Sequence, residues 1–393
     1  MHNNAEWITQ KRILVVQLVS LGDCLFVTTI AQQIKHDYPG CHLTWAISNR
    51  CSQIIRDNPN IDEIWEIFLE KMSDAWGDAW KETKKKALEK KENGLYDYIF
   101  FTQLYPDNFS NYDGSIRSST FRGYPNPITT PVTPFIRLDG TEIENVRIFA
   151  EQNKLEKFRH VILFECSPGS IQSQMNHHFA LEVSKKIADK FEDAVILLTS
   201  NQKIDTHHDR IIDASVLTFR ENAELSKYCN LLIGCSSGIT WLLTSNWAKK
   251  LPTIQILKKR ALEFEFASVS YDLEYWGQPI DHIIEITKFD EEYVSDCVKM
   301  TLEEGVSEAR KKYNEKLKPN IISLILIIAD IIYFKKFKEI TKVIRNFHNR
   351  NNYSIKMIVP IIIIAIPFII YRILLRYFIN IKKKFTIRPI HQD

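Results

Sequence analysis

The chain has 393 residues, of which 45% are hydrophobic and 25% are charged, and it carries a formal net charge of +3. This balance is that of an ordinary globular protein, and the length suits two domains with an extension. The small net charge does not favour a nucleic-acid-binding protein. Seven cysteines include no CxxC pair, and polar residues lead directly into the first apolar run. We therefore expect reduced thiols in the cytosol, no metal site and no cofactor.

The segment from Arg12 to Pro39 predicts a strand, a tight turn and a helix. Residues 13–16 are a short apolar run, and apolar residues recur at helical spacing after the turn. This is half of a nucleotide-binding βαβ unit, whose turn presents backbone N–H groups to an anion. Asp23 stands in that turn, and two compatible roles are open for it. It could cap the helix, act as a general base above the carboxyl end of the strand, or do both.

The remainder of the first 150 residues adds strands, a charged helix and a long polar stretch. We expect residues 70–93 to be a solvated surface helix, although Trp76 and Trp80, four residues apart, could mark a mobile substrate-side element. Residues 104–138 are long and irregular, as functional or disordered segments often are. Arg117 and Arg122 lie there and could meet an anionic substrate. Strands are predicted at 42–47, 61–67 and 96–103, and a short helix at 52–58.

The second part of the chain repeats the alternation of strands and helices. Strands are predicted at 161–164, 194–199, 210–213, 231–233 and 252–257, and helices at 142–154, 179–191 and 222–228. Alternating elements of this kind form parallel sheets covered by helices. The sequence therefore predicts an α/β protein with two facing Rossmann-like domains, at residues 1–150 and 151–318.

The last quarter of the chain differs in kind. Residues 289–317 predict one long amphipathic helix that closes the second domain. Residues 321–334 are almost wholly apolar, and residues 357–371 carry no charge between basic flanks. Because a span needs about 20 apolar residues, this run is short for one. We expect residues 319–393 to be a membrane-associating helical tail that lies on the cytosolic face of the inner or plasma membrane. A true span and a core-packed helix are the alternatives.

Small residues follow three of the predicted strands. Backbone N–H groups and hydroxyls at such turns can hold a phosphate, although a single glycine after a strand is usually only a turn. The first turn contributes Gly22 beside Asp23. The candidate anion-binding residues of the second domain are Ser167, Gly169, Ser170, Gly234, Ser236, Ser237 and Gly238.

Four stretches resemble the heptosyltransferase-type glycosyltransferases of family 9, which have the GT-B fold. Leu-Gly-Asp at 21–23 follows the first strand, and NPNIDEI at 58–64 is similar to the family's NPxVDEV stretch. Tyr-Asp at 96–97 leads a strand into Gln103, and LLIGCSSGI at 231–239 is similar to the family's LVVGxDSGxxHLA stretch. The resemblance covers residues 12–260.

The resemblance implies a metal-independent, inverting transfer of a hexose or heptose from a nucleotide-sugar to a lipid-linked or cell-surface glycan precursor. Asp23 would be the general base that deprotonates the acceptor hydroxyl. The acceptor would lie near Gly22, Arg117 and Arg122, and the loops of the second domain would hold the donor diphosphate.

The chain departs from the family pattern at three places. Ser236 replaces the family's Asp, Trp241 replaces its His, and residues 174–179 lack the Lys that reaches the donor phosphates. An inactive GT-B scaffold that binds a nucleotide-sugar at the membrane is therefore the alternative function. A sugar epimerase or dinucleotide enzyme is less favoured, since no GxGxxG turn follows the first strand. Candidate substitutes for the missing cation are His177, Lys258 and Lys259.

Overall fold

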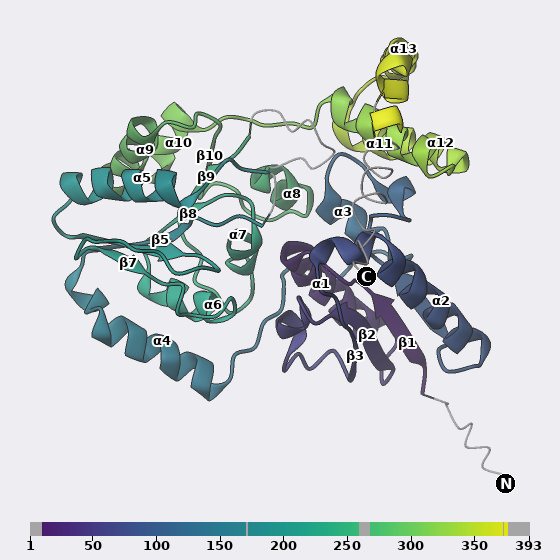
Figure 1. Cartoon of the computed structure of the whole chain (residues 1–393), viewed down its shortest axis with the longest axis horizontal. Helices are drawn as coiled ribbons and strands as arrows, with labels where there is room; N and C mark the ends of the chain where they lie inside the picture. Colours follow the sequence, from purple (N-terminus) through teal and green to yellow (C-terminus); the bar gives the residue numbers. More distant parts are fainter. Residues whose placement is uncertain (1–9, 170–171, 259–267, 372, 376–393) are drawn as a thin grey trace, which may run out of the picture.

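The first domain is built on a four-stranded parallel sheet (Figure 1). The structure is a computed structural model and describes residues 10–169, 172–258, 268–371 and 373–375. Residues 13–16 are β-branched or leucine side chains, and all four are fully buried within the sheet. The strands are β1 (Arg12–Val16), β2 (His42–Ser48), β3 (Glu63–Ile67) and β4 (Tyr98–Phe101), in the order β3-β2-β1-β4.

Helices cover both faces of this sheet. Ile13 and Val15 share a core with the helix α1 (Leu21–Asp37), whereas Leu14 shares a core with Trp80 of α2 (Asp78–Glu92). This alternation follows from the two-residue period of a strand. The shorter elements are η1 (Ser52–Ile55), η2 (Met72–Trp76), η3 (Phe109–Asn111) and α3 (Ile116–Phe121).

The second domain has a six-stranded parallel sheet. Its strands are β5 (His160–Glu165), β6 (Ala194–Thr199), β7 (Ile211–Asp213), β8 (Leu231–Gly234), β9 (Thr253–Ile256) and β10 (Ile283–Ile286), in the order β10-β9-β8-β5-β6-β7. Its helical elements are α4 (Gly140–Gln152), η4 (Leu155–Lys157), α5 (His177–Lys190), α6 (Glu221–Leu225), η5 (Ser226–Tyr228), α7 (Gly238–Leu242), α8 (Val269–Tyr275), α9 (Glu291–Glu303) and α10 (Val306–Tyr313). The prediction of two Rossmann-like domains is confirmed.

The two domains share one hydrophobic core. Ile162 and Phe164 pack with the layer formed by α5, α9 and α10, whereas Val161 and Leu163 point the other way. That second face belongs to the same cluster of buried side chains as α1 of the first domain. The carboxyl ends of the two sheets therefore meet across a packed junction between α1 and α7 (Figure 1).

Two of the predicted helices are each split by a glycine. The single helix expected at 289–317 is instead α9 and α10, because Gly305 adopts a φ of +92° between them. The helix expected at 70–93 is broken at Gly77 into η2 and α2. Trp76 and Trp80 consequently do not form one exposed face, since Trp80 is fully buried and Trp76 is 44% exposed.

The first part of the predicted tail packs against the first domain. The helices α11 (Ile321–Tyr333) and α12 (Ile340–Asn351), joined by η6 (Phe337–Glu339), form a core with Leu104, Phe109 and Tyr112. Nine of the thirteen residues of α11 are buried. Its apolar character is therefore satisfied within the protein, as in the core-packed alternative.

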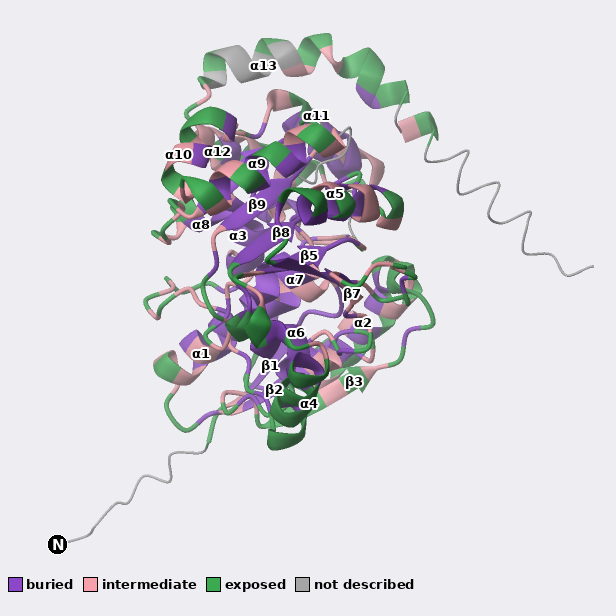
Figure 2. Cartoon of the chain, turned by 90° about the vertical axis from the view of Figure 1, so that its left-hand side faces the viewer, coloured by how far each residue is buried: buried purple, intermediate pink, exposed green. Residues whose placement is uncertain are grey.

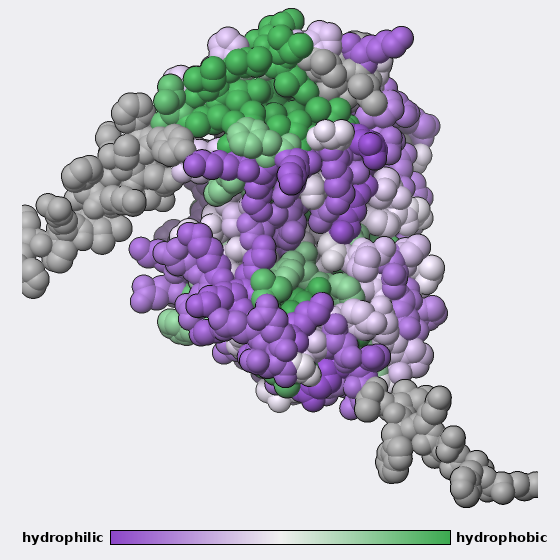
Figure 3. Space-filling view, turned by 90° about the vertical axis from the view of Figure 1, so that its right-hand side faces the viewer, coloured by the Kyte–Doolittle hydropathy of each residue, from purple (hydrophilic) through white to green (hydrophobic). Residues whose placement is uncertain are grey.

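The second part of the tail is different. The helix α13 (Ile355–Ile364) and the helical residues that follow it lie along the outside of the molecule (Figure 2), and apolar atoms gather there (Figure 3). Among the described residues, no helix combines the length and apolar character that crossing a bilayer requires. Large exposed apolar side chains in this segment are Ile363, Ile364, Ile366, Phe368, Ile370, Tyr371, Leu374 and Leu375.

The packing of α12 predicts the effect of removing Phe347, which is fully buried against α11 and η3. We expect Phe347→Ala to lower the free energy of unfolding by about 3–5 kcal/mol, because the truncation leaves a cavity. Urea unfolding of the full chain measures this change. Asn349→Ala on the exposed face of the same helix is the control and should change it by less than about 0.5 kcal/mol. Equal effects of the two variants would contradict the packed position of α12.

Candidate active site at the domain junction

Asp23 lies in the first turn of α1, directly after β1. The N-cap position is occupied by Ser20, so the prediction that Asp23 caps the helix is wrong. Ser20 has a φ of +74°, an uncommon backbone conformation for a residue with a side chain. This sharp turn places the third helical residue, Asp23, at the carboxyl end of the sheet, where parallel α/β proteins bind their ligands.

The surroundings of Asp23 make its carboxyl group a weaker acid than usual. Burial, the largest effect, raises the pKa of Asp23, and the Arg117 guanidinium, the next largest, lowers it. The Asp272 carboxylate raises the pKa and a hydrogen bond from Ser20 lowers it, and together these effects place it at about 6. Part of the residue remains exposed to solvent. A carboxyl group with a pKa near neutrality at this end of the sheet is suited to accept a proton.

Arg117 lies beside this carboxylate and is 5% exposed. Its guanidinium stacks on the ring of Trp241, 3.8 Å from the ring centroid, and its Nη1 donates to Asp272 Oδ2 at 3.3 Å. Its Nε has no hydrogen-bond partner within the part of the chain that the structure describes. The predicted acceptor-side arginine is therefore placed close to Asp23, with one donor unused.

The turn at Gly22 in the first domain contacts the turn and helix that begin at Gly238 in the second domain. A Cβ atom on Gly22 would lie 2.9 Å from Cδ1 of Trp241, and one on Gly238 would lie 3.4 Å from Cδ1 of Leu21. The Phe26 ring also meets Trp241 edge to face, at 5.3 Å between centroids. Trp241, which replaces the family's His, thus fills the space over the first turn. Gly22 and Gly238 are needed here for close approach.

The predicted donor loops of the second domain lie side by side. The Gly169 N–H donates to Ser237 Oγ at 3.3 Å, which joins the loop after β5 to the loop after β8. Ser167 Oγ bonds to Asn201 Oδ1 at 2.9 Å at the edge of the same region. Ser170 lies outside the described residues. The structure thus brings Ser167, Gly169 and Ser237 together.

A buried carboxylate that the sequence analysis missed occupies the start of α7. Glu165 ends β5 and accepts hydrogen bonds from the N–H groups of Ile239, at 2.9 Å, and Cys235, at 3.2 Å. It also accepts from Thr240 Oγ1 at 2.7 Å. A glutamate that ends a buried strand, followed by small residues, was the available signal. These N–H groups already serve an internal anion.

The other residues of this loop that were predicted to bind the donor diphosphate, Ser236 and Gly234, make contacts within the protein. The buried Ser236 donates its N–H to Gln255 Oε1 at 2.7 Å. Gly234 leaves room for Gln255 and Thr240, whose side chains a Cβ atom would strike. This loop therefore offers a ligand hydroxyl groups rather than a full set of backbone N–H groups.

The candidate substitutes for the missing cation are His177, Lys258 and Lys259. His177 Nε2 bonds to Ser200 Oγ at 2.8 Å, and the Lys258 N–H donates to the Gln172 carbonyl at 3.0 Å. Lys259 lies outside the described residues. The described residues contain no cluster of three or more His, Cys, Asp or Glu side chains that could hold a metal ion.

A network of ion pairs surrounds the far side of Arg117. Asp113 is fully buried and pairs with Arg122, at 2.5 Å, and with Arg350 of α12, at 3.1 Å. Arg122 also lies over the ring of Tyr275, at 6.0 Å from its centroid. Arg122 is therefore engaged within the protein. Sequence reasoning did not predict Arg350, because it lies in a segment interpreted as a membrane tail.

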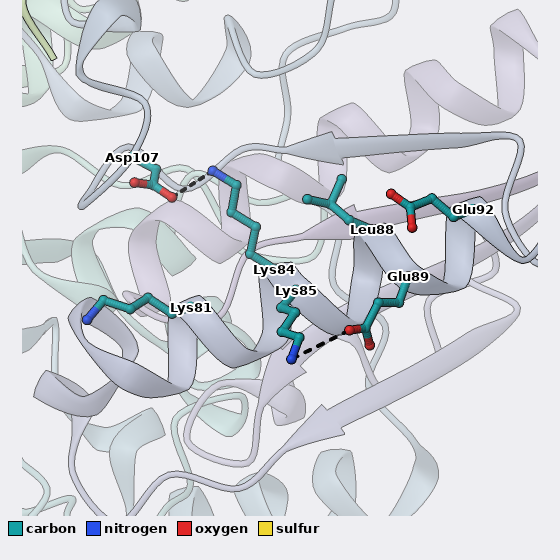
Figure 4. Close-up of a pocket in the computed structure, with 7 residues that line it drawn as sticks. All are labelled: Lys81, Lys84, Lys85, Leu88, Glu89, Glu92 and Asp107. Carbon is teal, nitrogen blue, oxygen red and sulfur yellow. Dashed lines mark hydrogen bonds and ion pairs between the residues drawn. The ribbon is translucent and has the colours of Figure 1, made fainter.

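A separate groove of about 420 Å³ runs along the outer face of α2 (Figure 4). Lys84 bonds to Asp107 there at 2.7 Å, and Lys85 pairs with Glu89 at 3.7 Å. The groove includes none of the predicted site residues. Its paired charges are those of a solvated helix surface.

No family model matches this chain, and no curated protein matches it. It is similar in structure to a family 9 glycosyltransferase from Veillonella parvula, with 14% identity and a TM-score of 0.48, over 76% of this chain and 93% of that chain. It is also similar to the E. coli heptosyltransferase WaaC with ADP, with 12% identity and a TM-score of 0.44, over 75% and 99%. A UDP-N-acetylglucosamine 2-epimerase is similar with 9% identity and a TM-score of 0.43, over 84% and 98%.

Glu165 provides a test of this arrangement. We expect Glu165→Gln to lower the free energy of unfolding by about 1–3 kcal/mol, because an amide cannot accept all the hydrogen bonds that the carboxylate receives. Urea unfolding measures the change. Glu192→Gln, at an exposed position, is the matched control and should have little effect. A loss no larger than that of the control would contradict the role of Glu165 at the start of α7.

Proposed function

We propose that the protein is a glycosyltransferase that transfers a sugar, with inversion and without a metal ion, from a nucleotide-sugar to a lipid-linked or cell-surface glycan precursor. The observation that carries this proposal is Asp23: the carboxyl group of a half-buried residue that follows β1 at the junction of the two domains, with a pKa that burial raises to about 6. A general base works best when its pKa lies near the working pH. The likeness to solved structures concerns the fold alone.

In the proposed reaction Asp23 accepts the proton of an acceptor hydroxyl while that oxygen attacks C1 of the donor sugar. The bond between C1 and the diphosphate oxygen breaks, and the diphosphate leaves with the electron pair. The donor lies against Ser167, Gly169 and Ser237, and the hydroxyls of the two serines can donate to phosphate oxygens. The free Nε donor of Arg117 is available to an anionic group beside Asp23.

One observation favours a second candidate, a GT-B-fold scaffold that binds a nucleotide-sugar without turnover. Glu165 uses N–H groups at the start of α7, and Trp241 fills the space over Gly22. Neither these N–H groups nor the space that Trp241 fills is open to a donor in this arrangement. The scaffold predicts that Asp23→Asn leaves cellular function unchanged, whereas the transferase predicts its loss.

We also propose that the segment formed by residues 355–371 and 373–375 docks the protein on the cytosolic face of a membrane. Eight large apolar side chains of this segment are at least 44% exposed, more than single scattered residues on a soluble surface. Exposed basic residues lie near it in sequence, namely Lys338, Arg345 and Lys356. An apolar helix with basic neighbours is the composition that binds an anionic lipid surface in its plane.

The role of Asp23 predicts both a mutational and a pH effect. We expect Asp23→Asn to lower turnover by about 10²–10⁴-fold, because the amide cannot accept the proton. In the wild type, turnover should fall about tenfold per pH unit below about pH 6, where the carboxylate becomes protonated. The measurement is release of nucleotide by the full chain in detergent, with water as acceptor: nucleoside diphosphate from ADP-, UDP- or GDP-sugars, and CMP from CMP-sugars.

Stability is the control for this variant. The pKa of Asp23 is raised in the folded state, so the folded protein binds more protons than the unfolded chain between about pH 4 and pH 6. The ionised carboxylate therefore costs stability above that window. Asp23→Asn should melt at the same temperature as the wild type or higher at pH 7. Retained turnover in this variant, with a donor that the wild type uses, would refute the base assignment.

Membrane docking predicts the effect of a charge on the exposed apolar face. Ile364 is 78% exposed, and Ile364→Asp should weaken binding to vesicles of anionic phospholipid at least about fivefold, because the carboxylate resists burial among acyl chains. Co-sedimentation of the full chain measures this. Val216→Asp is the matched control, since Val216 is 72% exposed on the second domain. Equal binding by both variants would exclude this segment as the docking surface.

A further inference from the structure

The C-terminal helix α12 reaches into the junction between the two domains. Its Arg350 side chain is 2% exposed, and Nη1 lies 3.1 Å from both carboxylate oxygens of Asp113. Nη2 donates to the Tyr271 carbonyl at 3.1 Å and lies 3.4 Å from Asp272 Oδ1. Asp113 belongs to the first domain and Asp272 to α8 of the second. Arg350 therefore joins three separate segments of the chain.

The rings around Arg350 fix its direction. The guanidinium lies 4.0 Å from the ring centroid of Tyr271 and 4.2 Å from that of Tyr275. The neighbouring Asn351 donates to the Asp113 carbonyl at 2.7 Å and accepts from the Tyr271 hydroxyl at 2.7 Å. A planar guanidinium held on two sides has few other orientations available.

The contacts of Asp272 continue toward Asp23. Its Oδ2 accepts from Arg117 Nη1 at 3.3 Å, and its Oδ1 accepts from the Ser115 hydroxyl. Arg117 in turn stacks on Trp241 and lies beside Asp23. Arg350 and Arg117 thus hold opposite sides of one buried carboxylate, and Arg117 is the link to the candidate base.

The charges of this network balance. The carboxylates of Asp23, Asp113 and Asp272 are matched by the guanidinium groups of Arg117, Arg122 and Arg350. The groups that act on Asp23 come from three places: Arg117 of α3, Asp272 of α8 and Ser20 of the preceding turn. Without Arg350, three carboxylates would share two guanidinium groups, and Arg117 would be drawn toward Asp272.

We propose that Arg350, supplied by the C-terminal segment, is a positioning residue of the active site: it holds Asp272 and Asp113 so that Arg117 stays stacked on Trp241 beside Asp23. The meaning of this for catalysis rests on the proposed function. The position of Arg350 makes residues 340–351 part of the site.

The test follows the titration of Asp23 without any substrate. The difference in melting temperature between the wild type and Asp23→Asn, measured from pH 4.5 to pH 8 on the full chain in detergent, reports the protonation of Asp23. The pH at the midpoint of this titration should be about one unit higher when both proteins also carry Arg350→Met, because a compensating positive charge is lost. Arg345→Met, an exposed arginine of the same helix, should leave the midpoint in place.

Hydrogen exchange provides a second readout. In Arg350→Met, amides of residues 19–26 and 236–243 should exchange at least about tenfold faster, because the junction opens more often. Arg350→Lys keeps the charge, so it should reverse at least half of the midpoint shift expected for Arg350→Met. It is also the variant to measure if Arg350→Met does not fold. An unchanged midpoint, or faster exchange confined to 321–351, would overturn the proposal.

The proposed function fails separately from this inference. If no nucleotide-sugar is turned over by the wild type while the midpoint moves, Arg350 positions the junction of a protein that is not a transferase. If turnover occurs and the midpoint does not move, the transferase stands and Arg350 has a local structural role only.

Discussion

The pairing of Asp113 and Asp272 with three arginines is the constraint on which the domain junction depends. Both carboxylates are fully buried, and a buried charge without a partner is strongly destabilising. Arg122 and Arg350 satisfy Asp113, while Arg117 and Arg350 satisfy Asp272. The charged groups of this network come in part from α3, α8 and α12. If one of these elements moved alone, a buried charge would be exposed to solvent or left without its partner. The candidate base lies at the edge of this arrangement and takes its electrostatic environment from it.

A second buried pair holds the opposite end of the junction. Arg220 of the second domain is fully buried, donates to Glu142 at 2.7 Å and also donates to the carbonyls of Gln53 and Arg56 in the first domain. Between these two ionic clusters the turns at Gly22 and Gly238 are in direct contact. A Cβ atom on Gly22 would lie 2.9 Å from Trp241, so no open space remains between these two residues.

Much of the fold could be predicted from the sequence, because buried parallel strands are continuous apolar runs with turn-forming residues at their ends. Helix lengths were less predictable: Gly305 and Gly77 end helices that the charge pattern alone would continue. Asp23 was recognised from its place after β1, but its environment was not, since Asp272 and Arg350 are 249 and 327 residues away in sequence. Ion pairs over such separations leave no periodic pattern. Glu165 was missed for a similar reason, because its partners are backbone N–H groups.

The C-terminal segment shows why hydropathy alone cannot assign an apolar helix. The helices α11 and α13 are similarly apolar, yet α11 is buried against the first domain and α13 exposes Ile363 and Ile364. What distinguishes them is how the nearby basic residues are used. Lys336 bonds to Asp107 and Arg350 to Asp113, which draws α11 and α12 onto the protein. Lys356 is exposed beside α13. The proposals for Arg350 and for membrane docking build on this difference between the two ends of one tail.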